Sequence, residues 1–210
     1  MTILALEFSS EQRSVAVSRG ESILSEAMES GERSVAAFAM IEKVLVQAKL
    51  EREEIETIAI GLGPGSYTGV RAGIALAQGW QLARETKVVG ISSVAAIVEQ
   101  ARAEKLFGRV SVVVDAQRGE FYFATYEIAV TSQAELAPLK ILPMAEVQSR
   151  ANESRILIGP EAAKFFPNGW AVFPRASAVA ALAAGRGDFL AGEKLEPIYL
   201  RETNFVKAVK

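Results

Sequence analysis

A glycine-rich segment in the first half of the chain constrains the fold more than any other feature of the sequence. Residues 61–73 read GLGPGSYTGVRAG, which places five glycines within thirteen positions. The sequence predicts a short buried strand over 58–60 before this segment and a helix over 69–84 after it. Glycine tolerates positive φ angles and a close approach of two backbones. The segment is therefore predicted to be a tight turn from a strand into a helix.

The unpaired N–H groups at the start of that helix suit an anion, which makes phosphate binding one function of the turn. The segment has no Lys-Ser/Thr pair of a Walker A loop and lacks the spacing of a dinucleotide-binding fingerprint. A purely structural turn stays open as the alternative. Positions that would face a phosphate are Gly63, Gly65, Ser66, Thr68 and Arg71. Arg71 could equally meet an acidic partner or form a surface salt bridge.

The predicted strands and helices follow nearly the same order in both halves of the chain. The first half reads as three strands, a helix, a strand, a helix, a strand and a helix, over residues 3–6, 14–18, 22–28, 34–49, 58–60, 69–84, 88–91 and 93–105. The second half has strands over 110–114, 121–128, 139–142 and 156–158 and helices over 146–151 and 177–184. We therefore predict an α/β fold built from a duplicated unit whose second copy is degenerate. The two small α/β domains are placed at 1–105 and 106–210.

The chain contains no histidine and no cysteine. This composition excludes Ser-His-Asp and Cys-His catalytic arrangements, a histidine general base, a Cys/His zinc site and any disulfide. Of the 25 acidic residues only Asp115 and Asp188 are aspartates. Asp115 follows a predicted strand and precedes a tight turn, where a carboxylate commonly accepts backbone N–H bonds. Arg118 in the same turn is either a contact for a partner or an RNA phosphate, or an ordinary exposed arginine.

The charge and hydropathy of the chain describe a globular protein without a membrane segment. The formal net charge is −2, which gives no overall attraction to nucleic acid. The longest apolar stretches, over 35–41 and 178–184, are far shorter than the roughly 18 residues of a membrane span. The first predicted strand begins at residue 3, which leaves no room for a leader. We expect a cytoplasmic protein that meets nucleic acid only through a partner.

Small residues recur every four positions along the predicted helix over 69–84. Gly69, Gly73 and Ala77 form one row, and Ala75, Gly79 and Ala83 form a second. Such rows let another element pack closely, either within the monomer or from a second chain. The largely apolar helix over 34–49 suits the second possibility. The predicted partner interface contains Ser34, Phe38, Ile41, Gly69, Ala72, Gly73, Leu76, Ala77 and Trp80. Gly73→Leu is expected to abolish pairing and to leave the monomer folded.

Four blocks of the sequence resemble a known family. Residues 63–73, GPGSYTGVRAG, are similar to the GPGSFTGLRIG signature of the TsaB, or YeaZ, family of tRNA threonylcarbamoyladenosine biosynthesis proteins, with eight of eleven positions identical. Residues 3–10, ILALEFSS, resemble its opening ILALDTST, and residues 115–122, DAQRGEFY, resemble its DARRGEVY. Residues 197–201, PIYLR, match its terminal PxYLR. The blocks occur in the expected order and extend over nearly the whole chain.

The resemblance implies the duplicated fold of actin, sugar kinases and heat-shock chaperones (the ASKHA fold). In that superfamily the first hairpin and its counterpart in the second repeat face the phosphates of a nucleotide, which adds Glu7, Ser9 and Asp115 to the candidate phosphate-facing residues. The resemblance also implies a non-catalytic subunit that has no metal or cofactor of its own. This subunit pairs with TsaD through helices of the first domain and is joined by TsaE. Alone it forms a homodimer, and ATP or ADP is expected at the interface with TsaD.

The implied complex transfers threonylcarbamoyl to N6 of adenosine 37 in tRNAs that read codons beginning with A. This chain is expected to touch tRNA only through the complex. It departs from the family pattern in two places: Glu7 replaces an aspartate, and Arg33 replaces a histidine before Ser34. Both changes favour a scaffold. The alternative is a stand-alone nucleotide-dependent kinase or ATPase that uses Glu7 and Asp115. In the PIYLR block, Tyr199 and Leu200 are expected to pack the tail onto the body and Arg201 to be paired.

Overall fold

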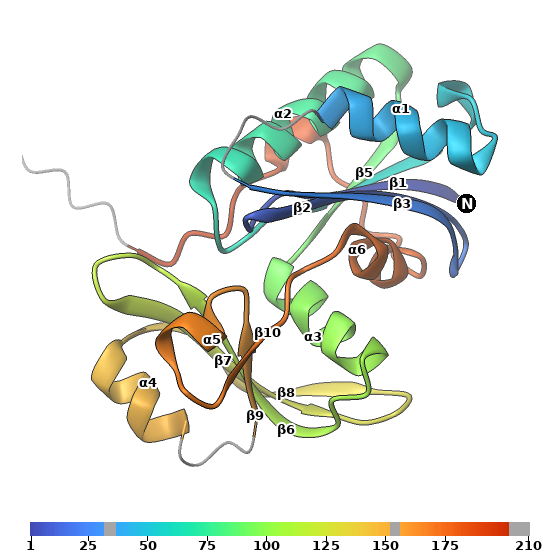
Figure 1. The fold of residues 1–210 in the computed structure, drawn as a ribbon. Coiled ribbons are helices and arrows are strands. Elements are labelled where there is room, and N and C mark those ends of the chain that lie inside the picture. Colours follow the sequence, from blue (N-terminus) through green and yellow to red (C-terminus); the bar gives the residue numbers. More distant parts are fainter. Residues whose placement is uncertain (32–36, 152–155, 202–210) are drawn as a thin grey trace, which may run out of the picture.

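Two five-stranded sheets form the two lobes of the molecule, as Figure 1 shows for the computed structural model, which describes residues 1–31, 37–151 and 156–201. The first sheet holds β1 (Thr2–Glu7), β2 (Gln12–Arg19), β3 (Ser22–Ser30), β4 (Thr57–Gly61) and β5 (Lys87–Ile91) in the order β3-β2-β1-β4-β5. The second holds β6 (Gly108–Asp115), β7 (Glu120–Ile128), β8 (Gln133–Pro143), β9 (Ile156–Gly159) and β10 (Gly169–Ala171) in the order β8-β7-β6-β9-β10. In each sheet the first three strands pair antiparallel, and the last two join in parallel. The two sheets therefore share one topology.

Among the described residues, three helices accompany the strands of each sheet in the same order. They are α1 (Ala37–Ala48), α2 (Tyr67–Arg84) and α3 (Ser93–Ala103), then α4 (Met144–Ala151), α5 (Ala162–Phe165) and α6 (Ala176–Ala183). The second set is shorter: α5 has 4 residues, whereas α2, at the same point of the repeat, has 18. The predicted duplicated α/β fold with a reduced second copy is confirmed. None of these described helices has the length and apolar character needed to span a membrane.

The central strand β1 is buried along its whole length. On one face of the first sheet, Leu4 and Leu6 pack in a cluster with residues of α1 and α2. On the other face, Ile3 and Ala5 pack with residues of α6. A strand that is covered on both faces needs a continuous apolar run rather than alternation. This requirement explains the uninterrupted ILAL at residues 3–6.

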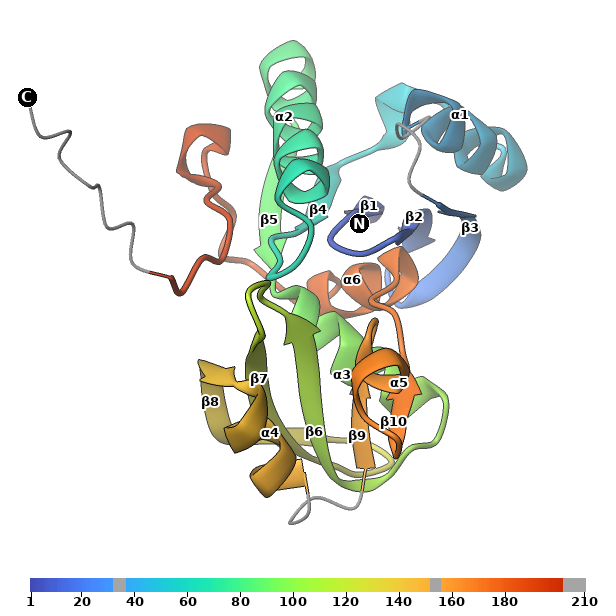
Figure 2. The same cartoon turned by 60° about the vertical axis from the view of Figure 1, so that its left-hand side comes forward.

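The last helix of each half packs against the sheet of the other half. Val94 and Ile97 of α3 pack with Val110 of β6, and Val179 of α6 packs with Ile3 of β1. Figure 2 shows α3 and α6 between the two sheets, where they also contact each other. Burial of these apolar side chains stabilises the junction between the lobes. The predicted domain boundary between residues 105 and 106 therefore separates the two sheets. It does not separate the two hydrophobic cores, because each core contains a helix from the other half.

Candidate functional site

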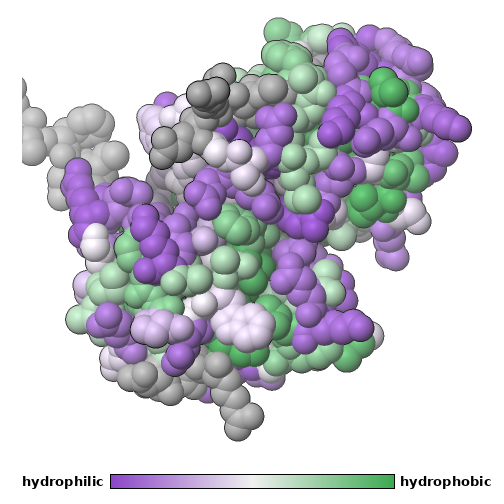
Figure 3. All heavy atoms as spheres, in the orientation of Figure 1, coloured by the Kyte–Doolittle hydropathy of each residue, from purple (hydrophilic) through white to green (hydrophobic). Residues whose placement is uncertain are grey.

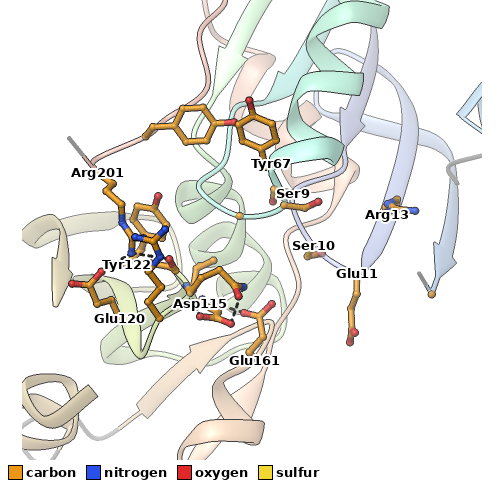
Figure 4. Close-up of a pocket in the computed structure, with 18 residues that line it drawn as sticks. Ser9, Ser10, Glu11, Arg13, Tyr67, Asp115, Glu120, Tyr122, Glu161 and Arg201 are labelled. Carbon is orange, nitrogen blue, oxygen red and sulfur yellow. Dashed lines mark hydrogen bonds and ion pairs between the residues drawn. The ribbon is translucent and has the colours of Figure 1, made fainter. Parts of the chain in front are cut away.

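A cleft of about 1320 Å³ lies between the lobes (Figure 4). On the first lobe it is lined by the β1–β2 turn and the start of α2. On the second lobe it is lined by the β6–β7 turn, by Glu161 after β9, and by the last described residues of the chain. The two turns occupy corresponding places in the repeat. The cleft is therefore the natural site for a ligand or partner that contacts both copies at once.

Four of the eight predicted phosphate-facing residues line this cleft, namely Ser9, Gly65, Ser66 and Asp115. Gly63 is buried in the turn, and Thr68 and Arg71 lie exposed on the first turns of α2 without lining the cleft. The Arg71 guanidinium lies over the ring of Tyr67, 4.2 Å from its centroid. The structure thus brings Ser9 and Asp115, from the two hairpins, to one cleft. Of the predicted residues in and after the glycine-rich turn, only Gly65 and Ser66 join them there.

Glu7 requires a correction, because its side chain is fully buried behind the cleft and does not face it. Its carboxylate accepts hydrogen bonds from the backbone N–H of Ser9 at 2.7 Å and from the Ser93 hydroxyl at 2.8 Å. Burial raises the pKa of Glu7, while the hydrogen bonds from Ser9 and Ser93 act in the opposite direction. A Cβ at Gly61 would lie 2.0 Å from Oε2 of Glu7, so this glycine makes room for the longer acid. Glu7 is a buried side chain that links the end of β1 to the start of α3 by its hydrogen bond with Ser93.

The glycine-rich turn directs its polar groups into the chain itself. The N–H of Gly63 donates to Oγ of Ser93 at 3.0 Å, and the N–H of Ser66 donates to the carbonyl oxygen of Ser9 at 2.6 Å. Oγ of Ser66 caps α2 by accepting the N–H of Gly69. Gly65 has a φ of +146°, and a Cβ there would lie 2.1 Å from the carbonyl oxygen of Ser9. The glycines at this turn allow it to pack on the β1–β2 turn, and these donors do not form a phosphate cradle.

Asp115 acts as a turn carboxylate, as the sequence predicted. It accepts the backbone N–H of Gln117 at 2.7 Å and the side-chain amide of Gln117 at 3.1 Å. This arrangement holds the β6–β7 turn, in which Gln117 and Arg118 both have positive φ. One face of Asp115 still lines the cleft.

Glu161 is a cleft residue that sequence reasoning missed. Burial raises the pKa of Glu161, and the negative charges of Asp115 and Glu11 add to this effect. Glu161 follows Gly159-Pro160 after β9, just as the glycine-rich segment follows β4, so the repeat itself was the signal for its position. Within residues 1–31, 37–151 and 156–201, no group of three or more His, Cys, Asp or Glu side chains is arranged to hold a metal ion.

The first row of small residues on α2 faces the chain's own first sheet. Gly69, Gly73 and Ala77 are buried, and Ile41 on α1 is only 2% exposed. A Cβ at Gly73 would lie 2.5 Å from Cδ1 of the buried Ile60. These residues therefore pack within the monomer, which corrects the prediction that they contact another chain. It also corrects the expectation for Gly73→Leu, since a leucine there would disturb the monomer.

The second row, formed by Ala75, Gly79 and Ala83, is exposed. Nothing lies within 4 Å of a Cβ built at Gly79. Leu82 in the same region is 90% exposed, and Figure 3 shows apolar side chains at the upper edge of the first lobe, over α2. Of the other predicted interface residues, Phe38 is exposed, whereas Ala72, Leu76 and Trp80 are half-buried. Ser34 lies outside the described residues.

Two α/β lobes that share one topology and enclose a central cleft define the class of actin-like and sugar-kinase-like proteins, as the sequence led us to expect. A family model described as "TsaD: tRNA N6-adenosine threonylcarbamoyltransferase" matches residues 28–189. The solved structure of YeaZ from Pseudomonas aeruginosa superposes with a TM-score of 0.81 at 27% identity, covering 95% of this chain and 99% of that one. The chain belongs to the family that this model describes and, within it, to the TsaB, or YeaZ, proteins.

Curated relatives carry the name "tRNA threonylcarbamoyladenosine biosynthesis protein TsaB". The protein from Escherichia coli is 32% identical over 128 residues, which are 60% of this chain and 55% of that protein. The protein from Buchnera aphidicola subsp. Schizaphis graminum is 29% identical over 163 residues, 75% of this chain and 77% of that protein. The matched region thus spans only about half the length of the Escherichia coli protein.

Proposed function

We propose that this chain takes part in tRNA threonylcarbamoyladenosine biosynthesis as a non-catalytic subunit. In this role it pairs with TsaD, is joined by TsaE, and supports the transfer of threonylcarbamoyl to N6 of adenosine 37, with tRNA bound through the complex. The names of its relatives and the match to the TsaD family model support the pathway. A cytoplasmic location follows as part of the same proposal.

The chemistry of the cleft supports a subunit that binds rather than catalyses. The sequence has no histidine to act as a base or to bind a metal ion. Glu7, the acid at the end of β1, is buried and engaged with Ser9 and Ser93. Asp115 is engaged with Gln117 in its own turn. Glu7 is therefore not accessible to a substrate, and the carboxylate of Asp115 serves to hold its own turn.

The observation that carries the proposal is a set of exposed apolar and small residues on two helices, Phe38 and Val46 on α1 and Ala75, Gly79 and Leu82 on α2, called the outer face here. Phe38, Val46 and Leu82 are 69%, 73% and 90% exposed. Large apolar side chains and a glycine with open space above it allow another helix to approach closely. We assign this face to TsaD in the complex and to a second copy of the chain when it is alone.

We assign ATP or ADP to the interface with TsaD rather than to the glycine-rich turn of this chain. The N–H groups of Gly63 and Ser66 already donate to Ser93 and Ser9. A nucleotide phosphate held by these two N–H groups would have to displace these bonds. The partner is therefore the better source of phosphate ligands.

Reconstitution tests the proposal. A mixture of TsaD, TsaE, the enzyme that forms the threonylcarbamoyl adenylate, and tRNA is assayed with and without this chain. We expect transfer only when the chain is present and none from the chain alone. Equal transfer without the chain would contradict the proposal. The alternative, a stand-alone ATPase or kinase, predicts ATP turnover by the pure chain that Asp115→Asn strongly reduces.

A further inference from the structure

The last described segment of the chain runs along the first lobe before it reaches the cleft. The N–H of Leu190 donates to the carbonyl oxygen of Val88 at 2.8 Å, next to the edge strand β5. Leu195 is only 4% exposed and belongs to the core beneath α1 and α2. The N–H of Ile198 donates to the carbonyl oxygen of Leu62 at 2.8 Å. Residues up to 198 are thus anchored to the first lobe.

The same segment ends on the second lobe. The Arg201 guanidinium donates to the carbonyl oxygen of Ala116 at 3.0 Å and forms an ion pair with Glu120. Ala116 lies in the β6–β7 turn and Glu120 begins β7, and both line the cleft. Three residues after its last hydrogen bond to the first lobe, the chain is therefore tied to the second.

Two tyrosines stack at the point where the segment crosses between the lobes. The rings of Tyr199 and Tyr67 lie 5.7 Å apart at an interplanar angle of 20°, and Arg71 lies over Tyr67. Figure 4 shows Tyr67 at the cleft, and Arg201 beside Tyr122 and Glu120. Stacking of this kind adds to the stability gained from burial alone. The start of α2 is thereby linked through Tyr199 to the second lobe.

The cleft is lined by charges of both signs. The carboxylates Glu11, Asp115 and Glu161 lie there together with an arginine of each lobe, Arg13 and Arg118. Opposite charges attract and like charges repel, so the lining carries both kinds of interaction between the lobes.

We propose that residues 195–201 form a clasp that holds the two lobes at a fixed angle, so that the chain's own tail sets the width of the cleft. The helices α3 and α6 join the lobes between the sheets, and the clasp joins them a second time at the cleft. A molecule that enters the cleft must fit beside Tyr199 and Arg201 or displace them. A movement of the start of α2 relative to the β6–β7 turn would therefore disturb the contacts of Tyr199 or Arg201. This inference stands without the proposed pathway or any partner.

Distance measurements between spin labels test the clasp in the full chain. Because the chain has no cysteine, labels attach only at two introduced sites, Glu21→Cys in the first lobe and Ser149→Cys on α4, both exposed positions. Labelled protein is diluted with unlabelled protein so that only distances within one chain contribute. Arg201→Glu and Tyr199→Ala are each added to this background.

We expect both clasp variants to shift or broaden the interlobe distance distribution. The matched control, Arg84→Glu, breaks an ion pair with Glu53 of similar exposure within the first lobe and should leave the distribution unchanged. Adding Glu120→Arg to Arg201→Glu reverses the ion pair and should restore a narrow distribution. If Tyr199→Ala does not fold, Arg201→Glu, at a half-buried position, decides the matter. A distribution in folded Arg201→Glu that coincides with the unaltered chain would overturn the proposal.

Discussion

The two rows of small residues on α2 have the same four-residue spacing but opposite surroundings. In the inner row, a Cβ at Gly69 would lie 1.9 Å from the carbonyl oxygen of Phe8, and one at Gly73 would lie 2.5 Å from Ile60. In the outer row, a Cβ at Gly79 would meet nothing within 4 Å. The inner glycines are required because α2 lies so close to its own sheet.

The outer glycine has no such requirement within the monomer. Glycine inside a helix costs about 1 kcal/mol relative to alanine. The inner row recovers this cost by close packing on the sheet, whereas no intramolecular contact recovers it at Gly79. The difference shows that the inner row serves the fold, and we propose that the outer row serves association.

The largest expected effect is that of Gly73→Leu on stability. A leucine would enter a filled core beside Ile60, and overpacking of this kind costs roughly 3 kcal/mol or more when the surroundings cannot move. Urea unfolding measures the loss. The same substitution on the outer row, Gly79→Leu, should leave stability unchanged or raise it by up to about 1 kcal/mol. An equal loss of stability in Gly73→Leu and Gly79→Leu would contradict the difference between the inner and outer rows.

A second effect concerns the acid behind the glycine-rich turn. Gly61→Ala places a methyl group against the carboxylate of Glu7 and should reduce the free energy of unfolding by roughly 2 kcal/mol. Glu7→Asp shortens the acid and should relieve part of that loss in the double variant. Urea unfolding of both single variants and the double variant gives the coupling energy. Additive losses would show that Gly61 and Glu7 do not interact as described.

Association should respond in the opposite sense to stability. Gly79→Leu should weaken pairing at least tenfold, equivalent to about 1.4 kcal/mol, because its side chain fills the space that a partner helix needs. Leu82→Arg should act likewise by adding a charge to the outer face. Analytical ultracentrifugation measures self-association, with Leu136→Arg as the control, since Leu136 is also exposed but lies on β8. Unchanged association in both α2 variants would remove the outer face from the interface.

The smallest effect is the pH dependence contributed by Glu7. Because the pKa of Glu7 in the folded protein lies above its ordinary value of 4.5, the folded chain binds this proton more tightly than the unfolded chain. The free energy of unfolding therefore falls as the pH rises from 4.5 to the folded pKa. Glu7→Gln lacks this slope and should gain stability relative to the unaltered chain over the same range. Urea unfolding at several pH values checks this, with the exposed Glu21→Gln as control.

The order of the elements was predictable because each long element has its own apolar pattern and the pattern repeats. Among the α-helices and strands of the described residues, those without a prediction are α5, with 4 residues, and β10, with 3, which are too short to show a periodicity. The exchange of α3 and α6 between the lobes was not predicted either. Which sheet a helix covers is decided by tertiary packing, and the sequence pattern of the helix alone does not contain it.

Site prediction succeeded where a residue's role is local. Asp115 holds its own turn, and Tyr199 and Arg201 attach the tail as expected, although Leu200 remains 43% exposed. The site prediction was wrong for Glu7, because only the folded structure shows that the longer side chain turns inward beneath Gly61. It was also wrong for Gly73, because two rows with equal spacing on one helix cannot be told apart until the sheet below is placed.

The central claim is that this chain supports threonylcarbamoyl transfer by binding through the outer face of α2. The most direct measurement is a titration of the chain into the reconstituted transfer reaction, comparing the unaltered protein with folded Gly79→Leu. We predict that the unaltered chain restores transfer to a plateau and that Gly79→Leu needs at least tenfold more protein to reach it. Identical titration curves would contradict the account.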